Sequence, residues 1–203
     1  VNIGITISDN CSPDAYDNVS IVFFEPPHPA FIGLPTTGCD PLIVNFEDQS
    51  TNVAQYFWSL GEGTTRETGG DFSHIYTKGI YDVSLQVVSP DGCKDNILKT
   101  GYIESYANPD AALTYQPKPL TTLSDQVQFM DRSLGEVNQW MWEFYTLDST
   151  LLDNRLDRNP ILTSPGEIGQ YLVYLHVTTI HQCVDKRRFQ TYCTRHTVRQ
   201  LRI

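Results

Sequence analysis

The sequence predicts an all-β chain of tandem β-sandwich domains. Three observations lead to this prediction: a residue pattern that recurs, strict alternation of apolar and polar residues within it, and no convincing helical period. The pattern recurs after roughly 80 to 90 residues, which is too long for a solenoid unit and suits a small sandwich domain. With 203 residues, the chain is long enough for two domains of about 100 residues each.

The recurring pattern is nearly complete twice. The first copy contains Phe46-x-Asp48-x-Ser50, Trp58-x-x-Gly61-Glu62-Gly63, His74-x-Tyr76, Gly79-x-Tyr81-x-Val83-x-Leu85-x-Val87 and Gly92-Cys93-x-Asp95. The second contains Phe129-x-Asp131-x-Ser133, Trp142-x-Phe144, Gly169-x-Tyr171-x-Val173-x-Leu175-x-Val177 and Cys183-x-Asp185. The first 25 residues carry the end of the pattern once more, as Ile3-x-Ile5-x-Ile7, Cys11 and Val19-x-Ile21-x-Phe23. We therefore expect a piece of an array of β-domains.

Strands are expected wherever apolar and polar residues alternate, as they do over 42–46, 55–60, 81–88 and 96–104. The alternation in 81–87 is strict, so one face is buried and the other meets water, as in an antiparallel sheet. Gly-rich and Pro-rich turn signals separate the runs. Only residues 147–156 come near a helical pattern.

Two Pro-bearing junctions divide the chain. Pro26, Pro27 and Pro29 mark the first, and Asn108-Pro109 marks the second. Proline stiffens a linker and fixes its direction, which predicts semi-rigid rather than freely jointed domains. The expected layout is a two-strand remnant of a preceding domain (1–27), a full domain (28–106) and a second, divergent domain (107–203). A hairpin alone cannot bury its apolar face, so the remnant is completed by the rest of its own domain or donated to another sheet edge.

Composition and charge restrict the class of protein. The net charge is −10, and charged residues make up only 19% of the chain, well below a disordered profile. No run of 18 apolar residues predicts a membrane span. An acidic chain argues against nucleic-acid binding, which needs a basic footprint. Six bases gather near the C-terminus, at Lys186, Arg187, Arg188, Arg195, Arg199 and Arg202. We expect them to protect a solvated edge strand, with contact to an acidic neighbour as the alternative.

The sequence has five cysteines and no metal-binding spacing among them. Cys11, Cys93 and Cys183 occupy the same position of the recurring pattern, which favours a structural role. Disulfides would place the protein in an oxidising, extracellular setting.

These motifs resemble the PKD (polycystic kidney disease) domain. The resemblance rests on Phe46-x-Asp48-x-Ser50, Trp58-Ser59-Leu60-Gly61-Glu62-Gly63, His74-x-Tyr76 and Gly79-x-Tyr81-x-Val83. The family's usual turn is W-D-F-G-D-G, from which this chain departs at Ser59, Leu60 and Glu62. The Gly38-Cys39-Asp40-Pro41-Leu42 opening and the Gly92-Cys93-x-Asp95 hairpin resemble the variant found in large secreted or surface proteins of Bacteroidetes, such as gliding-motility adhesins and type IX secretion cargo.

The resemblance implies an immunoglobulin-like β-sandwich with an extracellular spacer, adhesive or protein-contact role and no catalysis. It extends strongly over residues 28–105 and moderately over 107–193, where residues 145–164 replace the Gly-rich turn with a longer insertion. We interpret Trp58 and Trp142 as core residues between the sheets rather than sugar-stacking platforms. Tyr81 and Tyr171 are expected to be structural in the same way.

No residue pattern indicates a catalytic site or a cofactor. The second copy has no counterpart of His74, and a catalytic base should not be dispensable in one copy. No nucleophile or zinc-protease motif occurs. Calcium is the one ion that stays open: Glu47, Asp48, Glu62 and Asp95 offer oxygens, although no spacing resembles a calcium loop. Asp48 and Asp131, like Ser50 and Ser133, are better explained as turn-shaping side chains that bond nearby backbone.

The sandwich topology that the resemblance implies bears on the cysteines. Cys39 and Cys93 would lie at opposite ends of one domain, roughly 30 Å apart for strands of eight to nine residues. A disulfide needs Cα atoms within about 7 Å. In a head-to-tail array, however, the Cys39 end of one domain meets the last hairpin of the next. This predicts a Cys39–Cys183 bridge, and a bridge from Cys93 to a residue upstream.

The sequence therefore favours a non-catalytic extracellular segment of a large surface or secreted protein. It would act as a semi-rigid spacer and contact module, with neighbouring domains, other proteins or copies of itself as partners. The alternative is a polymer-engaging accessory segment of a secreted hydrolase, which predicts a row of exposed aromatic rings at Tyr102, Tyr106 and Tyr115. A third hypothesis is a subunit of a secretion or motility assembly.

Overall fold

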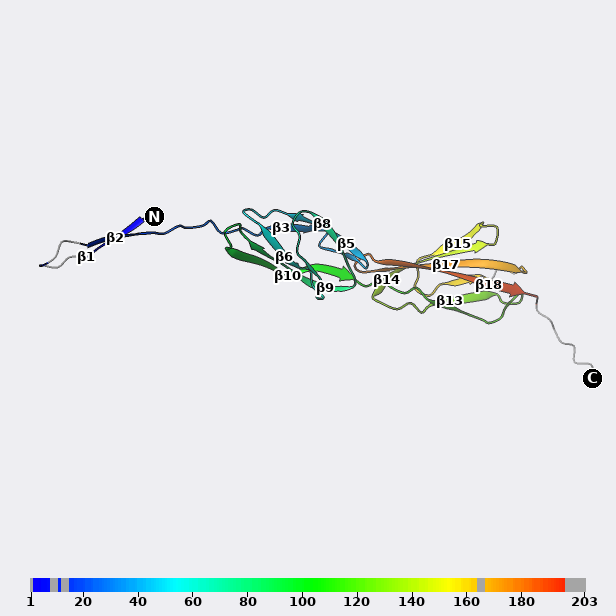
Figure 1. Ribbon diagram of the computed structural model, residues 1–203. Helices are drawn as coiled ribbons and strands as arrows, with labels where there is room; N and C mark the ends of the chain where they lie inside the picture. Colours follow the sequence, from blue (N-terminus) through cyan, green and yellow to red (C-terminus); the bar gives the residue numbers. More distant parts are fainter. Residues whose placement is uncertain (1, 8–10, 12–14, 164–166, 196–203) are drawn as a thin grey trace, which may run out of the picture. The chain divides into compact units, whose positions relative to one another are not determined.

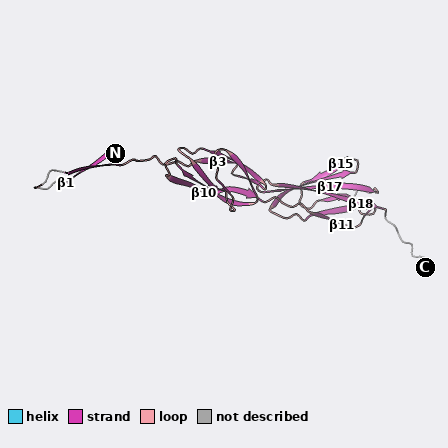
Figure 2. Cartoon of the chain, viewed as in Figure 1, coloured by secondary structure: helices cyan, strands magenta, loops and turns pink. Residues whose placement is uncertain are grey.

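Every regular element among the residues that the structure describes is a β-strand (Figure 2). The structure is a computed structural model that describes residues 2–7, 11, 15–163 and 167–195. The prediction of an all-β sandwich architecture is confirmed. Because the described residues form no helix, none of them supplies a helix that could cross a membrane. Arg199 and Arg202 of the basic stretch lie outside the described residues, as does Ile203, the last residue of the predicted second domain.

The chain clusters into two compact units, which are described separately. The first comprises residues 1–36, 44–74 and 80–103, and the second comprises 37–43, 75–79 and 104–203. The second unit therefore takes up residues 37–43 and 75–79 in addition to the C-terminal half.

The predicted remnant contains a two-stranded antiparallel sheet. Its strands are β1 (Asn2–Ile7) and β2 (Ala15–Ser20), with Asn2 opposite Ser20 (Figure 1). Residues 21–24 follow β2 without regular secondary structure, and their apolar side chains are exposed, up to 76% at Phe23.

Eight strands form two sheets within residues 31–106, here called the first sandwich. One sheet has the order β3 (Phe31–Leu34), β5 (Leu42–Asp48) and β8 (Phe72–Tyr76). The other has the order β4 (Thr37–Cys39), β10 (Lys94–Tyr106), β9 (Gly79–Val88), β6 (Gln55–Ser59) and β7 (Thr65–Arg66). Burial in β5 alternates strictly, as expected of a strand with one face in the core.

The second sandwich repeats this arrangement within residues 113–194. One sheet has the order β11 (Leu113–Gln116), β13 (Gln126–Asp131) and β16 (Ile161–Thr163). The other has the order β12 (Leu120–Thr121), β18 (Val184–Thr194), β17 (Gly169–Thr179), β14 (Val137–Thr146) and β15 (Leu151–Arg155). Each strand thus has an equivalent at the same place in the first sandwich, in the same sequence order. The long β17 and β18 supply several of the core residues, among them Val173, Leu175 and Cys193.

The segment that came nearest to a helical pattern is a strand hairpin. Residues 147–156 form the turn after β14 and the edge strand β15, which pairs with β14 from Trp142 opposite Arg155 to Tyr145 opposite Leu151. Leu147, Leu151 and Leu156 are exposed on it, so the apolar spacing that resembled a helix faces solvent.

The Asp-x-Ser motif closes each sandwich in the same way. Ser50 N donates to Asp48 Oδ1 at 3.0 Å, and Ser50 Oγ exchanges hydrogen bonds with the backbone of Ala30. Ser133 N donates to Asp131 Oδ1 at 2.9 Å, and Ser133 Oγ does the same with Ala112. The motif therefore ties the strand that it follows to the segment that enters the sandwich, as turn-forming side chains do.

Candidate functional site

The aromatic residues of the recurring pattern lie in the two cores. Trp58 and Trp142 are 1% and 0% exposed, so neither offers a ring face to a ligand. Tyr81 is buried and donates to Glu62 Oε1 at 2.9 Å. Tyr171 is half-buried against the second core and donates to the carbonyl of Glu167 at 3.1 Å. These four side chains have packing roles in the structure.

The calcium candidates do not meet. Asp48 accepts from Ser50 N, Glu62 from the Tyr81 hydroxyl, and Asp95 from Asn96 N. Across the described residues, no group of three or more His, Cys, Asp or Glu side chains converges as metal ligands would.

One disulfide joins Cys39 to Cys183, whose Cα atoms are 5.6 Å apart and which are 144 residues apart in sequence. Both cysteines belong to the second compact unit. Cys39 ends β4, and Cys183 lies in the hairpin between β17 and β18. Of the other cysteines named in the sequence prediction, Cys93 is a half-buried free thiol. No disulfide therefore joins Cys39 to Cys93 within the first sandwich.

Further contacts gather around the disulfide. The ring of Tyr106 stacks on that of His181, with centroids 3.7 Å apart and an interplanar angle of 9°. β4 pairs in parallel with the end of β10, where Cys39 lies opposite Tyr106. Asp40 N donates to the Tyr106 carbonyl at 2.9 Å, and Asn108 Nδ2 donates to the Asp40 carbonyl. The Tyr106 hydroxyl donates a hydrogen bond to Glu104, which raises the pKa of Tyr106.

These contacts bracket the second Pro-bearing junction. Residues before it (37–43 and 104–106) and after it (181 and 183) are joined by one covalent bond and one ring stack. Just beyond the junction, Ala111 N donates to Asp185 Oδ2 at 2.8 Å, and Ala111 is buried. Sequence reasoning proposed the cysteine pair but missed the His181 and Tyr106 stack, because neither residue recurs in the pattern.

The three tyrosines named by the hydrolase alternative each pack against another ring. Tyr102 packs edge-on against Phe31 and donates to Gly33 O at 3.3 Å. Tyr106 lies on His181, and Tyr115 packs against the core ring of Phe129. Each of the three rings is half-buried and has a partner within the chain.

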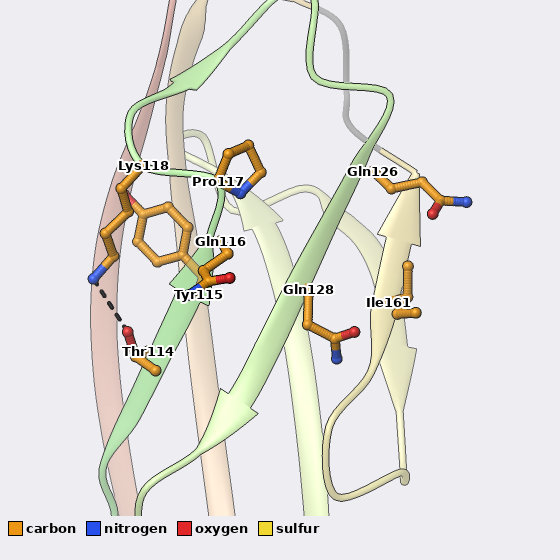
Figure 3. Close-up of a pocket in the computed structure, with 8 residues that line it drawn as sticks. All are labelled: Thr114, Tyr115, Gln116, Pro117, Lys118, Gln126, Gln128 and Ile161. Carbon is orange, nitrogen blue, oxygen red and sulfur yellow. Dashed lines mark hydrogen bonds between the residues drawn. The ribbon is translucent and has the colours of Figure 1, made fainter.

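A shallow depression of about 650 Å³ lies on the sheet of β11, β13 and β16 (Figure 3). Its polar wall comes from the amides of Gln116, Gln126 and Gln128. Lys118 Nζ donates to Thr114 Oγ1 at 3.2 Å and lies 4.7 Å from the Tyr115 ring centroid. Gln128 Nε2 already donates to the carbonyls of Asn159 and Phe129, at 2.9 and 3.1 Å. The depression can offer hydrogen bonds but brings together no acid–base pair.

Lys186, Arg187 and Arg188 of the basic stretch lie on β18 of the other sheet. β18 pairs with β17 from residue 184 to 193, whereas β12 covers only Cys193 and Thr194 on its opposite side. Lys186 lies 4.3 Å from the Tyr174 ring centroid and 4.0 Å from Glu143, which also bonds His176 at 2.9 Å. Lys186, Arg187 and Arg188 therefore lie on the part of β18 that β12 does not cover.

Comparison with known proteins gives a family match for one part of the chain. Residues 25–104 match the PKD domain family. No curated protein matches the sequence significantly.

Among solved structures, a Ca²⁺-stabilised adhesin with which an Antarctic bacterium binds ice has a TM-score of 0.47 at 8% identity, over 97% of this chain and 57% of that one. A bacterial 1.5-MDa ice-binding adhesin has a TM-score of 0.42 at 10% identity, over 85% and 67% of the two chains. A carbohydrate-binding module of the β-sandwich superfamily has a TM-score of 0.38 at 13% identity, over 83% and 96%. Likeness at this level says nothing about function.

Proposed function

We propose that this chain is a non-catalytic extracellular segment in which PKD-like sandwiches act as a semi-rigid spacer and protein-contact module. It would belong to a large secreted or surface protein, of the kind that serves as a gliding-motility adhesin or type IX secretion cargo. The observation that carries the proposal is the Cys39–Cys183 disulfide, because it ties segments on either side of the Asn108-Pro109 junction.

Three further features support this proposal. Residues 25–104 match the PKD family, whose members are known as extracellular modules. A disulfide persists in oxidising compartments and is rare in the reducing cytosol. The Tyr106–His181 stack and the Ala111–Asp185 hydrogen bond add non-covalent ties at the same junction.

The spacer role can be tested by ¹⁵N relaxation of the oxidised chain. We expect amides of β9 and of β17 to report one common rotational correlation time. In a Cys39→Ser/Cys183→Ser variant the two sets of amides should report separate and shorter times. Two separate correlation times in the oxidised chain would contradict the spacer role, even if the fold were intact.

A surface location can be tested on cells that make the full-length protein. Antibodies against the second sandwich should label intact cells, and the Cys39–Cys183 peptide pair should be recovered from them without reduction. Labelling only after cell lysis, with reduced cysteines, would contradict an extracellular role.

The contact role can be tested with the oxidised chain itself. Sedimentation velocity should show self-association that weakens with added salt, because the charges of the chain are uneven: residues 1–27 have four acids and no bases, whereas six bases lie at 186–202. A chain that stays monomeric at high concentration and captures no surface protein would count against a contact role. The polymer-binding alternative is addressed by affinity electrophoresis in polysaccharide gels, where retention of the chain would support it.

A further inference from the structure

The hairpins that carry Cys93 and Cys183 have the same local structure. In the first, Cys93 N donates to Ser89 Oγ at 3.1 Å and Ser89 N donates to the Cys93 carbonyl at 2.8 Å. In the second, Cys183 N donates to Thr179 Oγ1 at 3.1 Å and Thr179 N donates to the Cys183 carbonyl at 2.9 Å. The residue before each cysteine has positive φ, 87° at Gly92 and 64° at Gln182. The two thiols are therefore presented by the same turn.

The second hairpin shows what this position binds. Cys183 is bonded to Cys39, which ends a three-residue strand added in parallel to the end of β10. Its occupant is thus a short cysteine-bearing strand that lies beside residues 104–106. Cys93 has no such occupant in this structure, although it is half-buried and free.

Residues 22–24 are the counterpart of residues 104–106. Phe24 precedes His28 by four residues, as Tyr106 precedes Asp110. His28 exchanges both backbone hydrogen bonds with Thr51, and Asp110 exchanges both with Leu134. Each bridge is followed by a residue of positive φ, 56° at Asn52 and 99° at Gly135. The two sandwiches are therefore entered by the same backbone route.

The counterpart segment is uncovered. Val22, Phe23 and Phe24 are 67%, 76% and 54% exposed, whereas Glu104–Tyr106 pairs with β4. Contiguous exposed apolar side chains in a protein of net charge −10 mark a contact surface. A strand like β4, laid beside residues 22–24, would cover these side chains and bring a cysteine to Cys93.

We propose that Cys93 is the receiving thiol of a second disulfide clamp, whose occupant is a cysteine-bearing strand of the Thr37–Asp40 type laid parallel to Val22–Phe24. The occupant's source, a further domain of the same kind, rests on the proposed function. The bond forms by thiol–disulfide exchange: the Cys93 thiolate attacks the sulfur of the strand's cysteine held in a mixed disulfide, and the other thiolate leaves. One S–S bond forms and one breaks, so no further oxidant is needed.

The proposed clamp at Cys93 differs in one respect from the first clamp, which is the Cys39–Cys183 bond together with strand β4. Asp91 stands two residues before Cys93, where His181 stands two residues before Cys183. The Tyr106–His181 ring stack therefore has no counterpart at Phe24. We expect the second clamp to depend more on strand pairing and on the cystine itself.

The test uses the oxidised chain and a peptide that copies residues 35–44, with its cysteine activated as a thionitrobenzoate mixed disulfide. A Cys11→Ser variant removes an exposed competing thiol. The remaining thiol, Cys193, is buried, and burial raises its pKa, which slows its reaction. Release of thionitrobenzoate gives the rate, and non-reducing peptide mapping gives the site.

We expect the copied peptide to label Cys93 about tenfold faster than a peptide of the same composition with its flanking residues scrambled, which corresponds to about 1.4 kcal/mol of docking. Val22→Asp/Phe24→Asp, on exposed side chains, should abolish that preference and leave the scrambled rate unchanged. Equal rates for the two peptides, or labelling confined to Cys183 by displacement of Cys39, would overturn the proposal. Neither result bears on the relaxation test of the spacer, which involves only the first clamp.

Discussion

The two sandwiches have the same strand order and differ at three places where one has a polar partner that the other lacks. Trp142 Nε1 donates to the Asp157 carbonyl at 2.9 Å, whereas Trp58 Nε1 is buried without an acceptor. Arg158 Nε donates to Asp131 in the second sandwich. Ala111 N donates to Asp185, whereas the counterpart of Ala111 in the first sandwich is Pro29, which has no N–H to donate.

The difference lies largely in one connection. Between β6 and β8 the first sandwich has a short Gly-rich turn and the two-residue β7. The second has the β14–β15 hairpin and the segment 156–160, which supplies Asp157, Arg158 and Asn159. The insertion thus adds hydrogen bonds to the core framework and, on its outer side, exposes Leu147, Leu151 and Leu156. The longer connection therefore supplies polar partners that the first sandwich lacks at the same places.

The largest expected effect comes from emptying the core. Trp58→Ala and Trp142→Ala should each lower the free energy of unfolding by about 3–5 kcal/mol, since both rings are fully buried. Trp142→Phe should cost about 1 kcal/mol more than Trp58→Phe, because only Trp142 loses a hydrogen bond. Urea unfolding followed by circular dichroism, fitted for more than one transition, measures both pairs. An equal cost for the two Phe variants would show that the insertion contributes nothing to the second core.

Next in size is the disulfide. Replacing Cys39 and Cys183 by Ser should cost about 2–4 kcal/mol, because the bond closes a loop of 144 residues in the unfolded chain. Cys93→Ser is the matched control, since its hairpin is the same but its thiol is free; a change within about 0.5 kcal/mol is expected there. If the control destabilises the oxidised chain as much as the double variant, the hairpin and not the bond is responsible.

A smaller effect is expected at the Asp-x-Ser motif. Asp131→Ala should cost about 1–3 kcal/mol, because the buried carboxylate holds both Ser133 N and Arg158 Nε, at 2.9 and 3.2 Å. Asp48→Ala should cost about 1 kcal/mol, since half-buried Asp48 holds two neutral groups, Ser50 N and the Tyr56 hydroxyl. Arg158→Gln is the control, at less than about 1 kcal/mol for an exposed guanidinium. If urea unfolding shows a larger loss of unfolding free energy for Asp48→Ala than for Asp131→Ala, the insertion does not account for the difference between the two sandwiches.

Much of this comparison could be predicted from the sequence. The alternation in 81–87, the paired tryptophans and the Asp-x-Ser motif recur in the chain, and each has its counterpart in the structure because it depends on backbone periodicity and short-range bonds. The hairpin at 147–156 could not be predicted, since edge strands with exposed leucines lack the alternation that marks a buried face. Neither could the Tyr106–His181 stack or the Gln-lined depression, which depend on residues brought together from distant strands.

The smallest expected effect is a pH dependence confined to the first sandwich. Asp48 N donates to Asp71, and the equivalent Asp131 N donates to Asn159, so Asp71 and Asn159 occupy the same place in the two sandwiches. His74 lies three residues after Asp71, and its counterpart three residues after Asn159 is Leu162. Burial lowers the pKa of His74 below its ordinary 6.5, against an opposing effect of Glu62. The unfolded chain then binds the proton more readily, so stability is complete above about pH 6.5 and falls as the pH drops toward the folded pKa.

Urea midpoints between pH 7.5 and 5.5 should fall less steeply in His74→Leu, which copies the second sandwich, and in His74→Gln, which stays polar but does not titrate. Parallel pH profiles for all three proteins would exclude His74 as the cause, and a shallower profile in His74→Leu alone would point to packing instead of protonation.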